Sequence, residues 1–155
     1  MAEPDHPWVA DDFEVPRGLA TESFRLEPLG PQHNERDHRA WTTSIEHIRS
    51  TPGFDTWTWP PAEGMSLERN LSDLRRHAND FTQRAGFTYS VLDEEDVIGC
   101  VYIYPARDDR TVARVHSWVR ADRAELDKPL HDAVSAWLAY DWPFPEVRYA
   151  PRTGE

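Results

Sequence analysis

The chain has 155 residues, carries a formal net charge of −11, and is 39% hydrophobic and 12% aromatic. This length suits one domain, and the apolar content is enough to fill a core, which excludes a wholly disordered chain. The acidic balance provides no basic stripe to displace the counterions of a nucleic acid, so we expect no nucleic-acid partner.

Residues 1–22 combine several prolines with acidic residues and show little periodicity. We therefore expect an extended N-terminal arm, packed across the domain through Trp8 and Phe13. The arm lacks the basic and then apolar regions of a secretory signal, and no window of the chain approaches the roughly 18 apolar residues of a membrane span. The sequence thus predicts a cytoplasmic protein with no membrane partner.

Residues 23–155 are expected to form a single domain, which opens with a strand and a helix. Phe24 and Leu26 alternate with polar residues over 23–29, the pattern of a strand, and Pro28 marks its end or a sheet edge. Apolar residues at helical spacing predict a helix over 31–50, which the sequence at 51–53 breaks. The stretch 54–64, with Trp57 and Trp59, is predicted to be a structured loop.

A second helix is predicted to begin after Ser66, a good N-cap residue. Its apolar stripe consists of Leu67, Leu71, Leu74, Ala78 and Phe81, and Gly86 lies just beyond it. Three strands follow, over 87–92, 97–104 and 111–119, with an acidic turn at 93–96. Their alternation and turn signals predict an antiparallel meander.

An amphipathic helix follows the meander at once. Its apolar face consists of Leu126, Leu130, Val134, Trp137 and Leu138. Asp127 is predicted to be its N-cap, and Pro129 fits the first turn, where a missing N–H costs little. Pro143 ends this helix, and a last strand covers 146–149. The predicted fold class is α/β (α+β), in the order β-α-α-β-β-β-α-β, with a mixed, mostly antiparallel central sheet flanked by helices.

This order and three of its segments resemble the GNAT superfamily of N-acyltransferases. The segments are the opening strand at 24–29, the hairpin at 87–104 with Val97-Ile98-Gly99 after its acidic turn, and Trp118-Val119-Arg120-Ala121-Asp122 running into a helix. The resemblance covers 23–149 and stops after the strand that would be the family's fifth. It implies an N-acyltransferase that moves an acyl group from acetyl-CoA or another acyl-CoA to a small-molecule amine.

The resemblance also implies where the cofactor would lie. In the family, the strand before the helix offers backbone groups to the pantetheine arm, and a glycine-rich loop at the helix N-terminus wraps the pyrophosphate. The cofactor-binding candidates here are Trp118, Val119, Arg120, Arg123 and Lys128. The matching loop at 123–130 contains no glycine, and Glu125 and Asp127 place negative charge where the pyrophosphate would lie. The loop is therefore degenerate.

His116, on the strand that faces the expected cleft, is the candidate general base, because the ordinary pKa of histidine suits proton transfer. Tyr102 and Tyr149 are candidate proton donors. The candidate substrate-binding residues are Trp41, His47, Trp57, Trp59 and Arg114, in which the tryptophans would form an aromatic wall and the arginine would hold an anionic group. For each of them, ordinary packing or a surface role stays open as the alternative.

Other functions stay open or lack their motifs. His33 and His38 are five residues apart, outside the spacing of helical metal ligands, so no metal site is predicted. Hydrolase, Walker and dinucleotide motifs are missing. The alternatives are a GNAT-shaped protein that binds a ligand or partner without acyl transfer, and a CoA-independent enzyme on the same scaffold. An exposed sheet edge makes a homodimer a candidate assembly, with cover by the arm as the other explanation.

Overall fold

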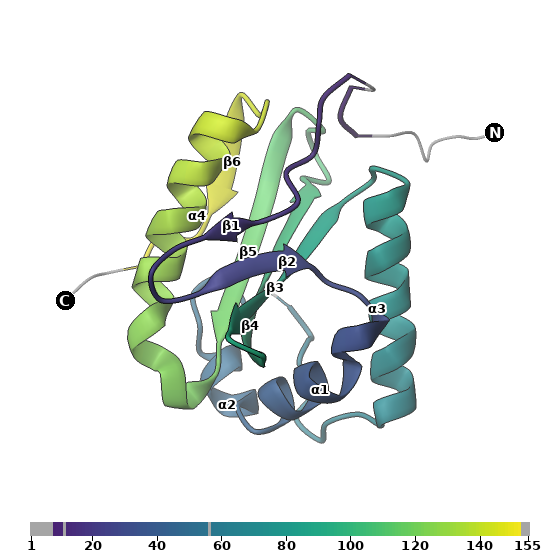
Figure 1. Ribbon diagram of the computed structural model, residues 1–155, viewed down its shortest axis with the longest axis vertical. Helices are drawn as coiled ribbons and strands as arrows, with labels where there is room; N and C mark the ends of the chain where they lie inside the picture. The colour runs from purple at the N-terminus through teal and green to yellow at the C-terminus, as the bar shows by residue number, and fades with distance from the viewer. Residues whose placement is uncertain (1–7, 11, 56, 153–155) are drawn as a thin grey trace.

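The computed structural model describes residues 8–10, 12–55 and 57–152 (Figure 1). The strands are β1 (Leu19–Ala20), β2 (Arg25–Pro28), β3 (Phe87–Asp93), β4 (Asp96–Pro105), β5 (Val112–Val119) and β6 (Glu146–Tyr149). The helices are α1 (Asn34–Thr42), α2 (Ile45–Arg49), α3 (Leu67–Thr82) and α4 (Asp127–Asp141), with short 3-10 helices η2 (Pro31–His33) and η3 (Ala121–Leu126).

The strands form one six-stranded sheet in chain order, β1-β2-β3-β4-β5-β6. Neighbouring strands run antiparallel except β5 and β6, which are parallel because α4 carries the chain back between them. The mixed, mostly antiparallel sheet and its flanking helices confirm the predicted fold class.

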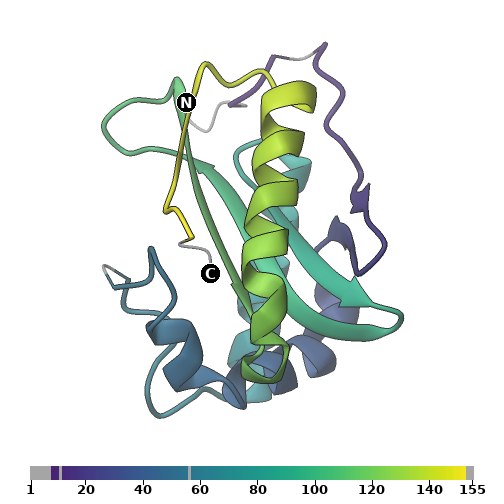
Figure 2. The ribbon, with the colours of Figure 1, turned by 90° about the vertical axis from the view of Figure 1, so that its left-hand side faces the viewer.

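Two hydrophobic cores lie on the two faces of this sheet. On one face, α4 buries Leu130 and Val134 against strand residues such as Val101. On the other, α1–α3 bury residues such as Trp41 against Trp118 of β5. Figure 1 shows α4 and α3 on opposite sides of the molecule, and Figure 2 shows α4 lying lengthwise over its face of the sheet.

The single helix predicted over 31–50 is wrong, because the segment divides into η2, α1 and α2. At the break, Thr43 Oγ1 donates a hydrogen bond to the carbonyl of Arg39 at 2.8 Å, the kind of side-chain contact that competes with helix propagation. Ser44 Oγ then accepts a hydrogen bond from the N–H of Ala121 at 2.8 Å. The break therefore ties the start of α2 to the segment that leads into α4.

Asp127 does not cap α4, which corrects a second expectation. Leu126 holds the N-cap position without a side-chain hydrogen bond, since η3 leads directly into α4 and the N–H of Asp127 donates to the carbonyl of Ala124. The carboxylate of Asp127 accepts from Arg152 instead. The predicted N-cap of α3 is confirmed, because Ser66 Oγ accepts from the N–H of Arg69 at 3.1 Å.

The described part of the arm packs on the domain through Trp8 and Phe13, as predicted. The ring centroid of Trp8 lies 4.5 Å from that of Phe144, and Phe13 lies 5.7 Å from Trp142. The residues predicted as arm also include β1, which pairs with β2. This short strand covers the edge that β2 would otherwise expose.

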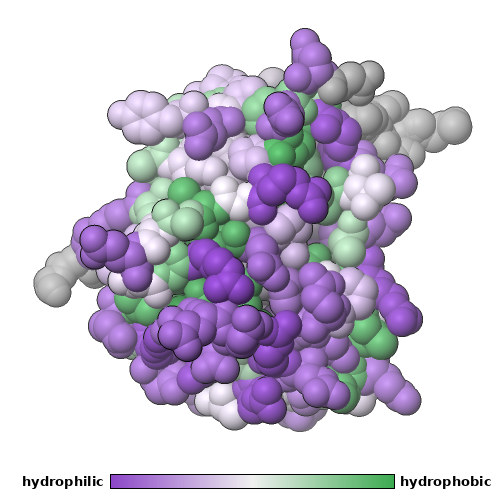
Figure 3. Space-filling view, in the orientation of Figure 1, coloured by the Kyte–Doolittle hydropathy of each residue, from purple (hydrophilic) through white to green (hydrophobic). Residues whose placement is uncertain are grey.

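The described helices include none with the length and apolar character of a membrane span. The face drawn in Figure 3 is mostly hydrophilic, with only small, separate apolar areas. Such a surface agrees with a formal net charge of −11.

Candidate functional site

A cavity of about 240 Å³ opens on the sheet face opposite α4, between α1, α3 and the loop that follows α2. We call it the α1–α3 pocket. It is lined by Leu29, Asp37, Trp57, Trp59, Asn70, Asp73, Leu74, Arg76, His77 and Tyr102. A concave site with apolar walls and a few convergent polar groups is the usual form of a small-molecule site.

Two buried polar residues, Asp37 of α1 and Asn70 of α3, form one side of this pocket. Asn70 Nδ2 donates to Asp37 Oδ2 at 3.0 Å and to Asn34 Oδ1 at 2.9 Å, while Asn70 Oδ1 accepts from Trp41 Nε1 at 2.9 Å. Burial raises the pKa of Asp37 to about 6, against the opposing effect of the Asn70 hydrogen bond. Asp37 therefore places a negative charge in the pocket at neutral pH.

Trp57, Trp59 and Tyr102 form an aromatic wall in the same pocket. The ring centroids of Trp57 and Trp59 lie 5.7 Å and 6.3 Å from that of Tyr102. Tyr102 presents its ring to the cavity, while its hydroxyl accepts from Trp118 Nε1 at 3.0 Å and burial raises its pKa well above the usual range. Trp41 does not line the cavity. It is fully buried, and its ring centroid lies 5.2 Å from that of Trp59.

His77 of α3 completes the set of polar groups in the α1–α3 pocket. Its Nδ1 lies 2.9 Å from Tyr104 Oη and 3.2 Å from Thr88 Oγ1. Burial, and secondarily the charge of Arg76, lowers the pKa of His77 to about 4. The imidazole is therefore neutral at physiological pH.

The structure does not bring the remaining predicted residues into this pocket. His116 packs against Trp57 with ring centroids 3.9 Å apart, and burial lowers its pKa to about 4, with Arg114 adding to the effect. The hydroxyl of Tyr149 lies 2.6 Å from Ser117 Oγ. His47 lies on α2, and neither it nor Arg114 lines the cavity.

Three of the pocket residues, Asp37, Asn70 and His77, were not singled out from the sequence. Asp37 lies three and four residues before Ala40 and Trp41, on the face of α1 that the core buries. Asn70 and His77 follow Leu67 and Leu74 by three residues each, on the inward side of α3. These polar residues recur at the helical spacing of the apolar residues, which places them on the buried face of each helix. Because a buried polar group needs a hydrogen-bond partner or a ligand, this spacing was the signal in the sequence for a site.

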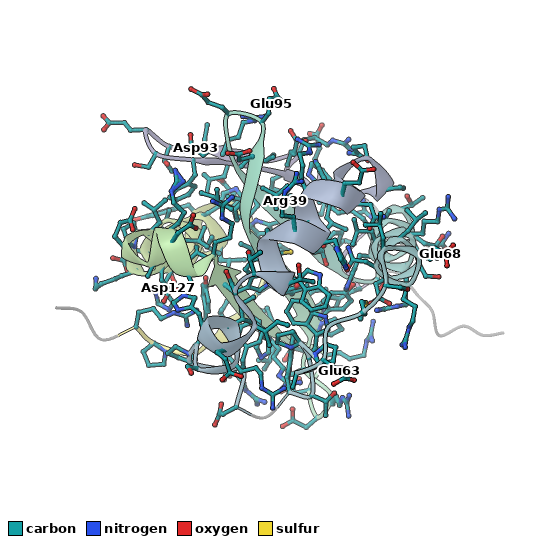
Figure 4. The ribbon with its side chains drawn as sticks, turned by 90° about the horizontal axis from the view of Figure 1, so that it is seen from below. Arg39, Glu63, Glu68, Asp93, Glu95 and Asp127 are labelled. Atoms are coloured by element: carbon teal, nitrogen blue, oxygen red, sulfur yellow. The ribbon has the colours of Figure 1, made fainter. Side chains whose placement is uncertain are left out.

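On the α4 face, β5 and β6 diverge. Their parallel pairing ends where Val115 meets Tyr149, whereas the pairing of β5 with β4 continues to Val119. Arg152 fills the gap, with its side chain only 4% exposed. Its Nη2 donates to the carbonyl of Ser117 at 2.9 Å and its Nε donates to Asp127 Oδ2 at 2.7 Å. In the view from below, Asp127 and Glu68 of α3 lie on opposite sides of the molecule (Figure 4).

In the segment before α4, several backbone N–H groups are already hydrogen-bonded within the chain. The N–H groups of Ala121, Arg123 and Asp127 donate to Ser44 Oγ, the Arg120 carbonyl and the Ala124 carbonyl. The predicted cofactor-binding cations are each paired with a carboxylate: Arg120 with Asp122 at 2.7 Å, Lys128 with Asp132 at 2.8 Å, and Arg123 with Asp93. In this conformation, the residues do not fit the diphosphate of a CoA.

The comparisons with known proteins rest on structure alone. No protein-family sequence model matches the chain, and no curated protein sequence matches it. RimL, the ribosomal L7/L12 alpha-N-protein acetyltransferase in complex with coenzyme A, aligns with a TM-score of 0.62 and 10% identity over 79% of this chain and 65% of RimL. The microcin C7 self-immunity acetyltransferase MccE, in complex with acetyl-CoA and AMP, aligns with a TM-score of 0.62 and 14% identity over 83% of this chain and 68% of MccE.

A third match is a ribosomal-protein-S5-alanine acetyltransferase from Vibrio fischeri, with a TM-score of 0.58 and 14% identity over 78% of this chain and 66% of the relative. The fold is that of the GNAT acyltransferases. The chain spans about two thirds of the length of these GNAT structures. At such identities, the GNAT likeness establishes the fold, and the chemistry has to be argued from the residues of this chain.

Metal chemistry has no support in the described residues. Within 8–10, 12–55 and 57–152, no group of three or more His, Cys, Asp or Glu side chains is arranged to hold a metal ion.

Proposed function

We propose that the protein is a GNAT-fold N-acyltransferase whose acceptor, a small-molecule amine, binds in the α1–α3 pocket. The observation that carries this proposal is the buried carboxylate of Asp37 in a cavity walled by Trp57, Trp59 and Tyr102. An ammonium group gains from a charge-assisted hydrogen bond to the carboxylate and from the negative faces of the rings. An anionic or purely apolar ligand would leave the buried charge of Asp37 offset only by the hydrogen bond from Asn70.

The position of the pocket supports an acceptor role. Trp57 contacts both Tyr102 of the pocket wall and His116 of β5. The pocket therefore adjoins the strand along which the GNAT resemblance places the pantetheine arm. In this proposal, Asp37 orients the amine and the rings exclude water, while a bound acyl-CoA would supply the activated acyl group.

A second candidate is a GNAT-shaped amine-binding protein that performs no acyl transfer. The filled gap between β5 and β6 favours it, because Arg152 already holds the Ser117 carbonyl and pairs with Asp127. The amides before α4 also favour the amine-binding candidate, because their N–H groups already donate hydrogen bonds within the chain. The two candidates share the amine site and differ in whether an acyl-CoA can enter the gap.

Calorimetry with acetyl-CoA, together with mass spectrometry of a panel of small amines incubated with acetyl-CoA, tests the first candidate. If acyl-CoA enters by displacing the guanidinium, Arg152→Ala should bind acetyl-CoA about tenfold more tightly than the wild type, which corresponds to about 1.4 kcal/mol. Acylated amine should appear with the wild type at high acetyl-CoA and with the variant at lower concentrations.

The matched control is Arg148→Ala, because Arg148 is an exposed arginine on β6 paired with Asp108 at 3.0 Å. It removes the same charge outside the gap and should leave acetyl-CoA affinity within about twofold, the range of a minor surface effect. If neither the wild type nor Arg152→Ala binds acetyl-CoA at millimolar levels, the acyltransferase proposal fails and the amine-binding candidate remains.

A further inference from the structure

The hydrogen bonds of His77 determine which of its ring nitrogens carries the proton. Tyr104 Oη donates to Asp80 Oδ2 at 2.8 Å, and burial raises the pKa of Tyr104, so the phenol keeps its single proton for that carboxylate. Tyr104 Oη can therefore only accept from His77 Nδ1, 2.9 Å away. This contact requires the proton on Nδ1 and leaves a lone pair on Nε2.

Gly86 makes this arrangement sterically possible. A Cβ built at Gly86 would lie 2.1 Å from the ring of Tyr104. Any other residue at 86 would push the phenol away from its present place between Asp80 and His77. The hydrogen bonds that link Asp80, Tyr104 and His77 therefore require glycine at position 86.

The polar atoms that the pocket offers to a ligand are mainly acceptors. Both amide protons of Asn70 are used, on Asn34 and Asp37, so the amide has no proton left for a ligand. The carboxylate of Asp37 and the neutral imidazole of His77, whose two hydrogen bonds within the described residues both use Nδ1, present lone pairs. The other charged groups of the lining are Asp73 and Arg76, which lie 3.5 Å apart and have side chains 36% and 59% exposed.

We propose that His77 is a specificity-determining residue, whose Nε2 accepts a hydrogen bond from an N–H of a ligand ammonium group while Asp37 binds its charge. The pocket then selects amines that carry N–H groups over quaternary ammonium ions of the same charge. The proposal deepens the proposed function, because it assigns a substrate class to the same pocket. It concerns binding alone, so it can be tested without any acyl donor.

Two probes of equal charge and the same ring test the selection: benzylamine and benzyltrimethylammonium, which differ in the presence of N–H groups. Their affinities are measured at pH 7.5 by calorimetry and by the fluorescence of the pocket tryptophans, in the absence of acyl-CoA. The wild type should bind benzylamine about tenfold more tightly than the quaternary ion, as one hydrogen bond to a charged donor allows.

The variant His77→Leu keeps a side chain of similar size but offers no acceptor. Its affinity for benzylamine should fall about tenfold, while its affinity for benzyltrimethylammonium should change by less than about twofold. Tyr104→Phe should give a smaller loss of selectivity, because the ring of His77 stays but its tautomer is no longer fixed. Thermal unfolding checks that both variants are folded.

Nitrogen-15 NMR of the wild-type histidines supplies a readout that does not depend on any variant. His77 should show a protonated Nδ1 and an unprotonated Nε2. The opposite tautomer, equal losses for both probes in His77→Leu, or no binding of benzylamine at millimolar levels would each overturn the proposal. Amine binding with this selectivity, but without acyl transfer, would instead overturn only the acyltransferase proposal.

Discussion

The carboxylates of Asp37 and Asp127, on the two faces of the sheet, have different hydrogen-bond partners. On the α1–α3 face, Asp37 shares a cavity with aromatic rings and is bonded by one amide side chain. On the α4 face, Asp127 is bonded by the guanidinium of Arg152, which also holds the carbonyl of Ser117. One face keeps a charge available to a ligand, and the other neutralises its charges within the chain.

This difference shows why the GNAT fold alone does not settle the activity. The strands β5 and β6 diverge, yet the chain's own arginine fills the gap between them. The polar groups of the pocket on the opposite face belong to side chains such as Asp37 and His77, which the strand order does not specify. Substitutions on each face can show whether one face is closed and the other open.

The largest effect is expected from breaking the ion pair on the closed face. Asp127→Ala leaves the buried guanidinium of Arg152 without its carboxylate and should lower the free energy of unfolding by about 3 kcal/mol. The double variant Asp127→Ala, Arg152→Ala should lose less than the sum of the two single variants, as urea denaturation of all four proteins can show. A loss below about 0.5 kcal/mol for Asp127→Ala would mean that this face is not closed.

On the open face, Asp37→Asn should make the protein more stable above pH 6. The pKa of Asp37 is raised from 3.8 to about 6, so the folded state holds this proton more tightly, and stability falls as pH rises between these values. The deficit above pH 6 corresponds to about 3 kcal/mol, which asparagine removes. Urea denaturation at pH 8 should therefore favour the variant, and the difference should vanish below pH 4.

The matched control for Asp37→Asn is Asp73→Asn, in the same pocket but with a side chain 36% exposed. Its stability should change by less than about 0.5 kcal/mol at either pH. Amine binding should be lost in Asp37→Asn while its stability rises. Equal stability of the wild type and Asp37→Asn at pH 8 would show that Asp37 is not held in a desolvated site.

A moderate effect is expected at the N-terminus of α3, the helix that supplies Asn70 and His77. Ser66→Ala removes the side-chain cap on the N–H of Arg69 and should lower the free energy of unfolding by about 1 kcal/mol. Ser72→Ala, at an exposed position within α3, is the control and should be neutral or slightly stabilising. Thermal denaturation distinguishes the two, and equal melting temperatures would argue against the cap.

The smallest effect is expected for Lys128→Ala on α4. Its ammonium lies 2.8 Å from Asp132, but both side chains are about half exposed, so water and salt weaken the pair. The free energy of unfolding should change by no more than about 0.5 kcal/mol, and less at high salt. A larger change, or an altered affinity for acetyl-CoA, would mean that Lys128 has a role beyond this surface pair.

The sequence correctly predicted the fold class and, apart from β1 and the division of the first helix, the order of the elements. Alternating apolar residues marked β3–β5, and the stripe after Ser66 marked α3, because these periods place one side of each element in a core. Residue spacing did not reveal the break between α1 and α2 or the pairing of β1 with β2. The break involves a residue distant in the chain, through the hydrogen bond from Ala121 to Ser44, whereas β1 is only two residues long and too short to show an alternation.

Of the pocket, the sequence indicated Trp57 and Trp59 as parts of an aromatic wall, whereas it named Tyr102 as a proton donor. The lack of glycine before α4 was also visible from residue type alone. Only the tertiary structure placed Asp37 beside Asn70, aligned His77 with Tyr104 and brought Arg152 to Asp127. The two members of each pair lie from 25 to 33 residues apart in the chain. Their contacts depend on how helices pack on the sheet, which local periodicity does not encode.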